Sequence, residues 1–312
     1  MKSVTICIPC YNEADSLPEL YDRLRTLMES EPEYDWHLLV VDDGSTDSTP
    51  HIVRQMALDD PRVGYIILSR NFGKECALMA AIDRADSDAV VLMDADGQDP
   101  PQLVHDMLRY WEQGYQDVYT RRRSRGRESW MKRMFSTLFY RLMSATSRID
   151  MPENVGDFRL LDRQCVETLR RIRETERYNK GLFSWIGFKK KELVFDRADR
   201  TRGNTHWSFM RLTDLALEAI TSFTTAPLRL ATIIGAITAL GAFCFTVFYI
   251  AKTLIIGDPV QGFTTLVSIM LFLGGVQLLS IGILGEYIAR IYGESKHRPM
   301  YVIRETNNGK EQ

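Results

Sequence analysis

The chain has 312 residues, and its 39 lysines and arginines against 41 aspartates and glutamates give a formal net charge of −2. An apolar content of 45% with 26% charged residues is typical of a folded protein and excludes a disordered or collagen-like chain. Because nucleic-acid-binding proteins usually carry a basic excess, the near-neutral balance argues against nucleic acid as a partner.

The first part of the chain alternates strand-like and helix-like segments. Short apolar runs rich in β-branched residues predict strands at Val4–Pro9, His37–Val41, Tyr65–Leu68 and Ala89–Met93. Helical periodicity predicts helices at Asp15–Met28, Ser48–Leu58, Lys74–Ala85 and Pro101–Trp111. This alternation predicts an α/β fold in which helices cover both faces of a mostly parallel, doubly wound sheet.

Polar residues follow each of these predicted strands, in the segments PCYNE (9–13), DDGS (42–45), SRNFGK (69–74) and DADGQD (94–99). Sheets of this kind bind ligands at the carboxyl ends of their strands. Neither a glycine-rich dinucleotide fingerprint nor a GxxxxGK[ST] phosphate loop follows the first strand. We therefore expect a ligand site at this sheet edge that holds phosphates in another way.

Asp94 and Asp96 are the candidate metal ligands. Two residues apart at a strand end, they can direct both carboxylates to one side, and such hard oxygen ligands suit Mg²⁺ or Mn²⁺. An Asp-x-Asp pair alone is also typical of a solvated acidic turn. Asp42 and Asp43 in the neighbouring loop favour the metal, because carboxylates that converge on one edge repel each other unless cations or donors offset them.

Beyond Pro227 the charge nearly vanishes. Leu230–Ile250 and Phe263–Leu284 are uncharged runs of about 21 and about 22 residues, each long enough to cross a bilayer as a helix. We predict a transmembrane hairpin within residues 229–291, with helices at about 229–252 and 263–286. Two buried helices of a soluble core are the alternative.

The Lys/Arg distribution predicts the orientation of this hairpin. Only Lys252 lies in the linker, whereas basic residues flank the outer ends of the two runs, at Arg211, Arg229, Arg290, Lys296, Arg298 and Arg304. Both termini, including a tail at 292–312, are therefore expected in the cytoplasm. Met1 and Lys2 open directly into a strand, so we expect no signal peptide. Glycines at 274, 275 and 282 would allow close helix contacts, and we expect a homo-oligomer.

An arginine-rich stretch, Arg121–Arg127, follows a strand-like segment at Asp117–Thr120. Guanidinium groups bind phosphate through paired donors, although a solvated loop that touches anionic lipid would look the same. An apolar stripe at helical spacing over about 130–144 predicts a helix in the membrane interface, or else a core helix. A similar stripe over 207–228 predicts an amphipathic helix beside the membrane.

The motifs PCYNE, DDGSTD, RNFGKE, DADGQDPP, NVGDFRLLDR and LGEYIARIY, in this order, resemble those of the family-2 glycosyltransferases, in the dolichol-phosphate-mannose-synthase-like branch. Within that branch the chain is similar to bacterial undecaprenyl-phosphate (bactoprenol) glucosyltransferases. The resemblance implies a GT-A domain over 1–206, a UDP-sugar donor, Mg²⁺ or Mn²⁺, an undecaprenyl phosphate acceptor and a location in the bacterial inner membrane.

The resemblance also assigns roles to residues. It implies a nucleotide-sugar site formed by Pro9, Tyr11, Glu13, Asp42, Asp43, Lys74, Asp94 and Gln98, and a metal on Asp94 and Asp96. It implies a lipid-phosphate site formed by Arg122, Lys132, Ser136 and Arg200. Asp157 matches the position of a catalytic base and joins Asp96 as a catalytic candidate. Gly97 and His206 depart from the family, which often has Leu and Lys at those positions.

The expected reaction is a single displacement that inverts the anomeric carbon and gives a β-linked product. A phosphate monoester has a second pKa of about 6, so the acceptor is already largely ionised at neutral pH. Asp157 is therefore either a general base or a group that orients the acceptor or a neighbouring arginine.

The sequence leaves two alternative functions. A processive polysaccharide synthase shares this domain but carries several spans and a Gln-x-x-Arg-Trp motif, which this sequence lacks. A membrane scaffold without turnover would not need the acidic residues Asp94, Asp96 and Asp157.

Overall fold

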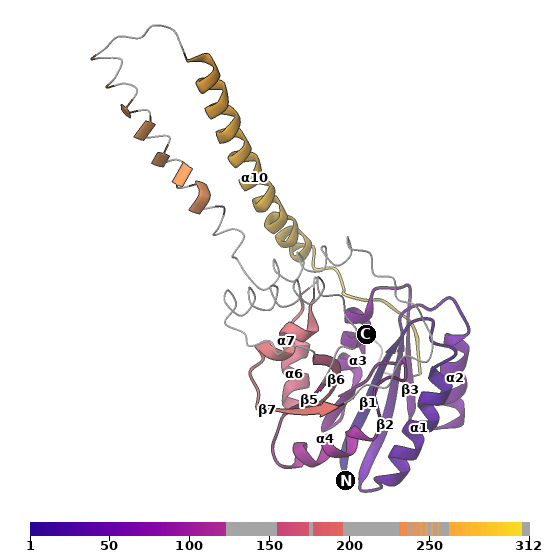
Figure 1. Cartoon of the computed structure of the whole chain (residues 1–312). Helices are drawn as coiled ribbons and strands as arrows, with labels where there is room; N and C mark the ends of the chain where they lie inside the picture. Colours follow the sequence, from indigo (N-terminus) through magenta and orange to yellow (C-terminus); the bar gives the residue numbers. More distant parts are fainter. Residues whose placement is uncertain are drawn as a thin grey trace. The chain divides into compact units, whose positions relative to one another are not determined.

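The computed structural model describes residues 1–122, 155–174, 177–195 and 262–307, together with scattered positions between 231 and 255. The chain divides into two compact units. The first contains Met1–Ser144, Ile149–Trp207 and Arg298–Gln312, and the second contains Ala145–Arg148 and Ser208–His297. The first unit holds an eight-stranded sheet with its helices (Figure 1).

Four parallel strands form the centre of the sheet, in the order β4-β1-β2-β3. They are β1 (Lys2–Cys10), β2 (Tyr34–Asp42), β3 (Val63–Leu68) and β4 (Ala89–Leu92). The helices that follow them are α1 (Leu17–Ser30), α2 (Thr49–Asp59), α3 (Lys74–Arg84) and α4 (Leu103–Glu112). Every strand and helix predicted for this region is present, with boundaries within a few residues.

Four further strands make the sheet mixed, in the full order β7-β5-β6-β4-β1-β2-β3-β8. They are β5 (Asp117–Arg122), β6 (Val155–Asp162), β7 (Lys190–Phe195) and β8 (Ile303–Thr306). β6 runs antiparallel to β4 and β5, β8 runs antiparallel to β3, and β7 is parallel to β5. The short helices α6 (Arg163–Arg171) and α7 (Asn179–Trp185) follow β6.

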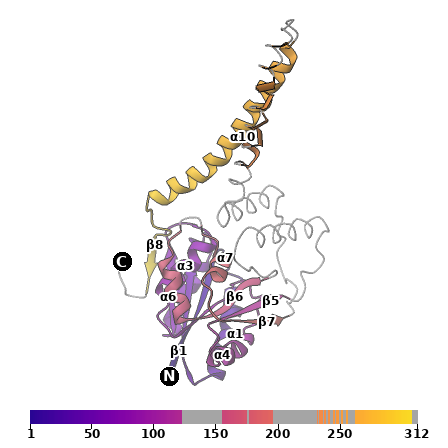
Figure 2. The same cartoon turned by 90° about the vertical axis from the view of Figure 1, so that its left-hand side faces the viewer.

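The sheet is buried between two helical layers. Alternate residues of β1, including Val4, Ile6 and Ile8, join the apolar faces of α1 and α4 in one core cluster. On the opposite side α3 packs on β1 and β2 and contacts α6 (Figure 2). Because both faces are covered, β1 is buried from Val4 to Cys10, as a continuous apolar run predicts.

In the second unit, α10 (Phe263–Ser295) contains a stretch, Phe272–Ser295, that is long and apolar enough to cross a membrane. This helix includes the second predicted span, 263–286, and continues beyond it because Glu286 and Arg290 end the apolar run without ending the helix. The described positions between 231 and 255 are helical. Most of the first span, the helices at 130–144 and 207–228, and Lys132, Ser136 and Arg200 lie outside the described residues.

The end of the chain belongs to the sheet, although the sequence predicts only a tail there. Glu305 of β8 accepts two hydrogen bonds from Arg54, at 2.8 and 2.7 Å, and one from the Tyr65 hydroxyl at 2.8 Å. The paired Arg54 donors hold the pKa of Glu305 at about 2. Nearby, Tyr301 and Arg173 both donate to Asp83. These contacts attach β8 to the edge of the sheet.

Glu305→Gln should therefore loosen the edge strand. Loss of a partly exposed but bidentate ion pair costs about 1 kcal/mol, which lowers the melting temperature of the purified protein by roughly 2–4 °C. Glu29→Gln is the matched control, because Glu29 forms a single, more exposed ion pair with Arg25 at 3.7 Å. Equal melting temperatures for the two variants would contradict this role of Glu305.

Candidate active site

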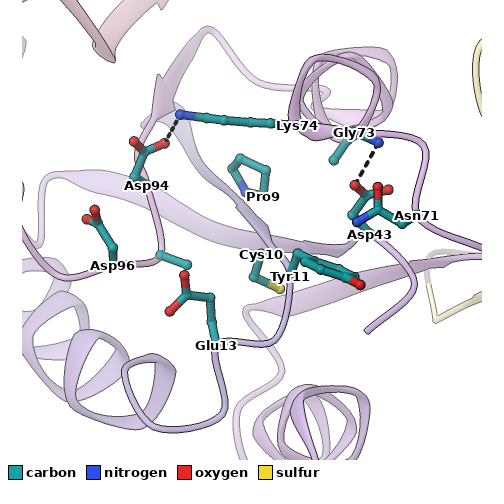
Figure 3. Close-up of a pocket in the computed structure, with 12 residues that line it drawn as sticks. Pro9, Cys10, Tyr11, Glu13, Asp43, Asn71, Gly73, Lys74, Asp94 and Asp96 are labelled. Carbon is teal, nitrogen blue, oxygen red and sulfur yellow. Dashed lines mark hydrogen bonds and ion pairs between the residues drawn. The ribbon is translucent and has the colours of Figure 1, made fainter. Parts of the chain in front are cut away.

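A cavity of about 290 Å³ lies where the loops after β1, β2, β3 and β4 meet (Figure 3). Its walls are Pro9, Cys10, Tyr11, Glu13, Asp43, Asn71, Gly73, Lys74, Ala77, Asp94, Ala95 and Asp96. Each of the four loops contributes, as expected for the carboxyl edge of a parallel sheet.

Most of the residues assigned from the sequence to the donor and metal sites line this cavity, namely Pro9, Tyr11, Glu13, Asp43, Lys74, Asp94 and Asp96. Asp42 is instead fully buried, and its carboxylate accepts from the backbone N–H of Ser45 at 3.2 Å. Gln98 lies beyond the cavity wall and donates its backbone N–H to Asp96 at 3.1 Å. Sequence reasoning assigned no binding role to the wall residues Cys10 and Asn71, whose only signal is their place at or just after the end of a strand.

Side-chain hydrogen bonds connect the loops after β1 and β2. Asn12 accepts from the backbone N–H of Thr46 at 2.9 Å and donates its own N–H to the Ser45 hydroxyl at 2.9 Å. Glu13 donates its backbone N–H to the Thr49 hydroxyl at 2.9 Å. This network holds the loop next to Tyr11, a residue that is 43% exposed and lines the cavity.

Asp43 shapes the loop after β3. Its carboxylate accepts from the backbone N–H groups of Phe72 at 2.8 Å and Gly73 at 2.9 Å. Burial raises the pKa of Asp43, and these two donors partly offset that rise. The adjacent Gly44 has a φ of +69°, and a Cβ there would meet the carbonyl carbon of Arg70 at 2.4 Å. Only glycine permits this close approach of the two loops.

Lys74, the first residue of α3, joins two acidic residues. Its Nζ lies 2.6 Å from Asp94 Oδ1 and 2.6 Å from Asp157 Oδ2. Burial would lower the pKa of Lys74, but Asp157 and Asp94 raise it above its ordinary value. Burial would likewise raise the pKa of Asp157, but the Lys74 ammonium lowers it, helped by Lys180. Asp157 is therefore a charged carboxylate with little tendency to accept a proton.

Asp94 and Asp96 fit a divalent cation. Both line the cavity, and they offer the carboxylate oxygens that Mg²⁺ and Mn²⁺ prefer. Among the described residues no group of three histidine, cysteine, aspartate or glutamate side chains forms a complete protein cage. A pair of carboxylates suits a cation that keeps waters and binds substrate phosphates. Arg23 supports the turn by donating to the Gly97 carbonyl at 3.1 Å.

The strand directions bring two further segments to the same edge. Because β6 is antiparallel to both β4 and β5, β5 runs in the direction of β4. The carboxyl end of β5, at Arg121 and Arg122, and the start of β6, near Asp157, therefore face the edge that carries the cavity. Arg121 forms an ion pair with Glu192 at 2.8 Å, and the side chain of Arg122 lies outside the described part.

A mixed α/β sheet with an Asp-x-Asp turn at its carboxyl edge is the arrangement of GT-A glycosyltransferases, and the fold and site define that class. The chain belongs to glycosyl transferase family 2, whose sequence model matches residues 5–170. Residues 226–291 match a second model, the GtrB C-terminal hairpin. The resemblance inferred from the motifs is confirmed, and the protein is a glycosyltransferase. The hairpin match and α10 together indicate association with a membrane.

Similar proteins extend over nearly the whole chain. A bactoprenol glucosyl transferase of Shigella phage SfV is 40% identical over 301 residues, which are 96% of this chain and 98% of the phage protein. An uncharacterized glycosyltransferase of Synechocystis is 41% identical and covers 96% of this chain and 94% of its own. Among solved structures, mannosyl-3-phosphoglycerate synthase from Rubrobacter xylanophilus matches with a TM-score of 0.46 and 19% identity, over 70% of this chain and 72% of that one.

Gly44→Ala tests the packing between the loops that follow β2 and β3. The added methyl group would push the Arg70 backbone away and displace the loop that leads into Lys74. KM for the nucleotide sugar should therefore rise at least tenfold, which corresponds to about 1.4 kcal/mol. Gly114→Ala is the control, since Gly114 also has a positive φ, +85°, but open space around it. Steady-state kinetics should show an unchanged KM for that variant. A similar KM in both would rule out the proposed loop contact.

Proposed function

We propose that this protein transfers glucose from UDP-glucose to undecaprenyl phosphate at the cytoplasmic face of the bacterial inner membrane. The observation that carries the proposal is the 40% identity to a bactoprenol glucosyl transferase over nearly the full length of both chains. The cavity supports it, because its walls combine an exposed tyrosine ring, an ammonium group and an Asp-x-Asp turn.

Each part of the cavity has a role toward the donor. We propose that Tyr11 stacks on the uracil base and that Asp43 acts indirectly, through the backbone of the loop it holds. Asp94 and Asp96 would hold Mg²⁺ or Mn²⁺ near the diphosphate. A divalent cation bound there supplies positive charge to the departing diphosphate. Pro9 and Glu13 complete the wall, while the buried Asp42 and the more distant Gln98 support the loops around it.

The acceptor is proposed to approach from the side of β5 and β6. Arg122, together with Lys132, Ser136 and Arg200, would bind the lipid phosphate. The support for Arg122 is the strand direction, which brings the carboxyl end of β5 to the cavity edge. One phosphate oxygen attacks the anomeric carbon as the bond to the nucleoside diphosphate breaks, which inverts the configuration.

Asp157 is proposed to act through its charge and not as a general base. Its ion pair with Lys74 lowers its pKa, and a group with a low pKa accepts protons poorly. The acceptor phosphate needs no base because it is already ionised at neutral pH. Of the two roles considered for Asp157, orientation of a neighbouring cation fits its surroundings better.

The membrane arrangement is proposed as two spans with both termini cytoplasmic. The hairpin match over residues 226–291 and the apolar helix α10 support it. A homo-oligomer is proposed as well. Among the residues that the structure describes, a Cβ added at Gly274, Gly275 or Gly282 of α10 would meet nothing within 4 Å, which leaves room for a neighbouring helix.

Membranes that contain the protein should transfer label from radiolabelled UDP-glucose to a lipid extractable with organic solvent. Membranes without the protein are the control, and UDP-galactose, UDP-N-acetylglucosamine and GDP-mannose should give less product. Label in an insoluble polymer would instead identify a processive synthase. If no donor gave any labelled product, the protein would be a scaffold without turnover.

Asp96→Asn should reduce transfer at least a hundredfold, even at high Mn²⁺, because the amide removes one of two anionic ligands. Asp59→Asn is the matched control and should keep full activity, because Asp59 is the last residue of α2 and does not line the cavity. Initial rates of lipid labelling measure both. Near-normal turnover in Asp96→Asn would remove the metal assignment.

A further inference from the structure

Lys74 occupies an unusual position for a lysine. It is the first residue of α3, where the positive end of the helix dipole disfavours a cation, so helix stability does not account for it. Its side chain is 45% exposed and reaches along the cavity wall to Asp94 (Figure 3). The attraction of two carboxylates offsets the unfavourable position.

Those two carboxylates come from separate parts of the sheet. Asp94 follows β4, and Asp157 lies on β6, 83 residues from Lys74 in the sequence. Their side chains are 24% and 10% exposed, so both lose much of their hydration. Without the ammonium between them, two shielded negative charges would face each other. Lys74 therefore acts as the counter-charge that keeps this part of the site together.

The same contact uses an oxygen of a proposed metal ligand. Asp94 Oδ1 already binds the ammonium at 2.6 Å. A divalent cation on that carboxylate would lie close to the Lys74 ammonium and repel it, so the two cations compete for Asp94. Asp157 offers Lys74 a second partner that is not a proposed metal ligand, at the same distance.

We propose that Lys74 is a positioning residue that changes partners when the donor binds. Without the donor it holds Asp94 and Asp157 together and weakens the binding of a divalent cation. When the donor binds, its negative diphosphate offsets the positive charge of the divalent cation. Lys74 then leaves Asp94, keeps its contact with Asp157 and faces the donor. The cation binds Asp94 and Asp96. Cation and nucleotide thus strengthen each other's binding. This inference rests on the proposed metal site.

Mn²⁺ binding to the purified full-length protein tests the exchange directly. Electron paramagnetic resonance of free Mn²⁺ gives its Kd with and without UDP, independently of turnover. Lys74→Met should bind Mn²⁺ at least fivefold more tightly than the wild type when UDP is absent, because the competing ammonium is gone. UDP should tighten Mn²⁺ binding by a larger factor in the wild type than in Lys74→Met. We also expect Lys74→Met to transfer sugar more slowly than the wild type.

Two variants separate direct competition from the general effect of charge. Lys74→Arg keeps the positive charge and should bind Mn²⁺ as weakly as the wild type. Lys180→Met removes a cation that also lowers the pKa of Asp157 but forms no ion pair among the described residues, and it should change the Kd less than twofold. Lys74→Gln, which can still hydrogen-bond to both carboxylates, replaces Lys74→Met if that variant does not fold.

The outcomes distinguish this inference from the proposed function. Unchanged or weaker Mn²⁺ binding in Lys74→Met would overturn the proposed change of partners by Lys74. The proposed metal site would stand in that case if Asp96→Asn abolished Mn²⁺ binding. If Lys180→Met tightened Mn²⁺ binding as much as Lys74→Met, the change of partners would also be overturned, because the effect would then come from overall charge. Absence of Mn²⁺ binding in every protein, with or without UDP, would overturn both the exchange and the metal assignment.

Discussion

Negative charge gathered at one edge of the sheet governs this site. Asp42 ends a central strand and Asp43, Asp94 and Asp96 follow central strands, and the chain offsets each of these charges separately. Backbone N–H groups donate hydrogen bonds to Asp42 and Asp43, Lys74 forms an ion pair with Asp94, and the backbone N–H of Gln98 donates to Asp96. Repulsion among these four carboxylates therefore does not by itself require a metal, although the sequence alone favours one on that ground. The argument for a cation rests on the position of Asp94 and Asp96 at the cavity.

Strand direction explains how residues far apart in the sequence serve one reaction. The central parallel strands supply the loops of the donor cavity. Because β6 is antiparallel to its neighbours, the start of β6 near Asp157 and the end of β5 lie at the same edge. Lys74 then connects the two groups, since it starts α3 on the donor side and pairs with Asp157 of β6. A single ion-pair network thus spans the donor side and the proposed acceptor side of the site.

The central strands and helices could be predicted because their signals are local. Apolar runs, helical periodicity and polar residues after each strand are all visible in the sequence, and the motif order identified the family. β8 could not be predicted in this way. Its four residues are short and half of them charged, and it is held by Arg54 and Tyr65, more than two hundred residues away. The Lys74 contact with Asp157 was hidden for the same reason, because nothing local to either residue indicates the other.

The surroundings of Asp157 also bear on what this enzyme has to accomplish. A general base works best with a pKa near the working pH, whereas Asp157 is held in its charged form by the ion pair that positions it. An ionised phosphate acceptor needs no proton removed, so its difficulty is electrostatic: an anion must approach a donor that already carries two phosphates. Fixed carboxylates, together with an ammonium that changes partners as proposed, would meet that need directly. Control of charge, with little proton transfer, is the chemistry that this arrangement of residues favours.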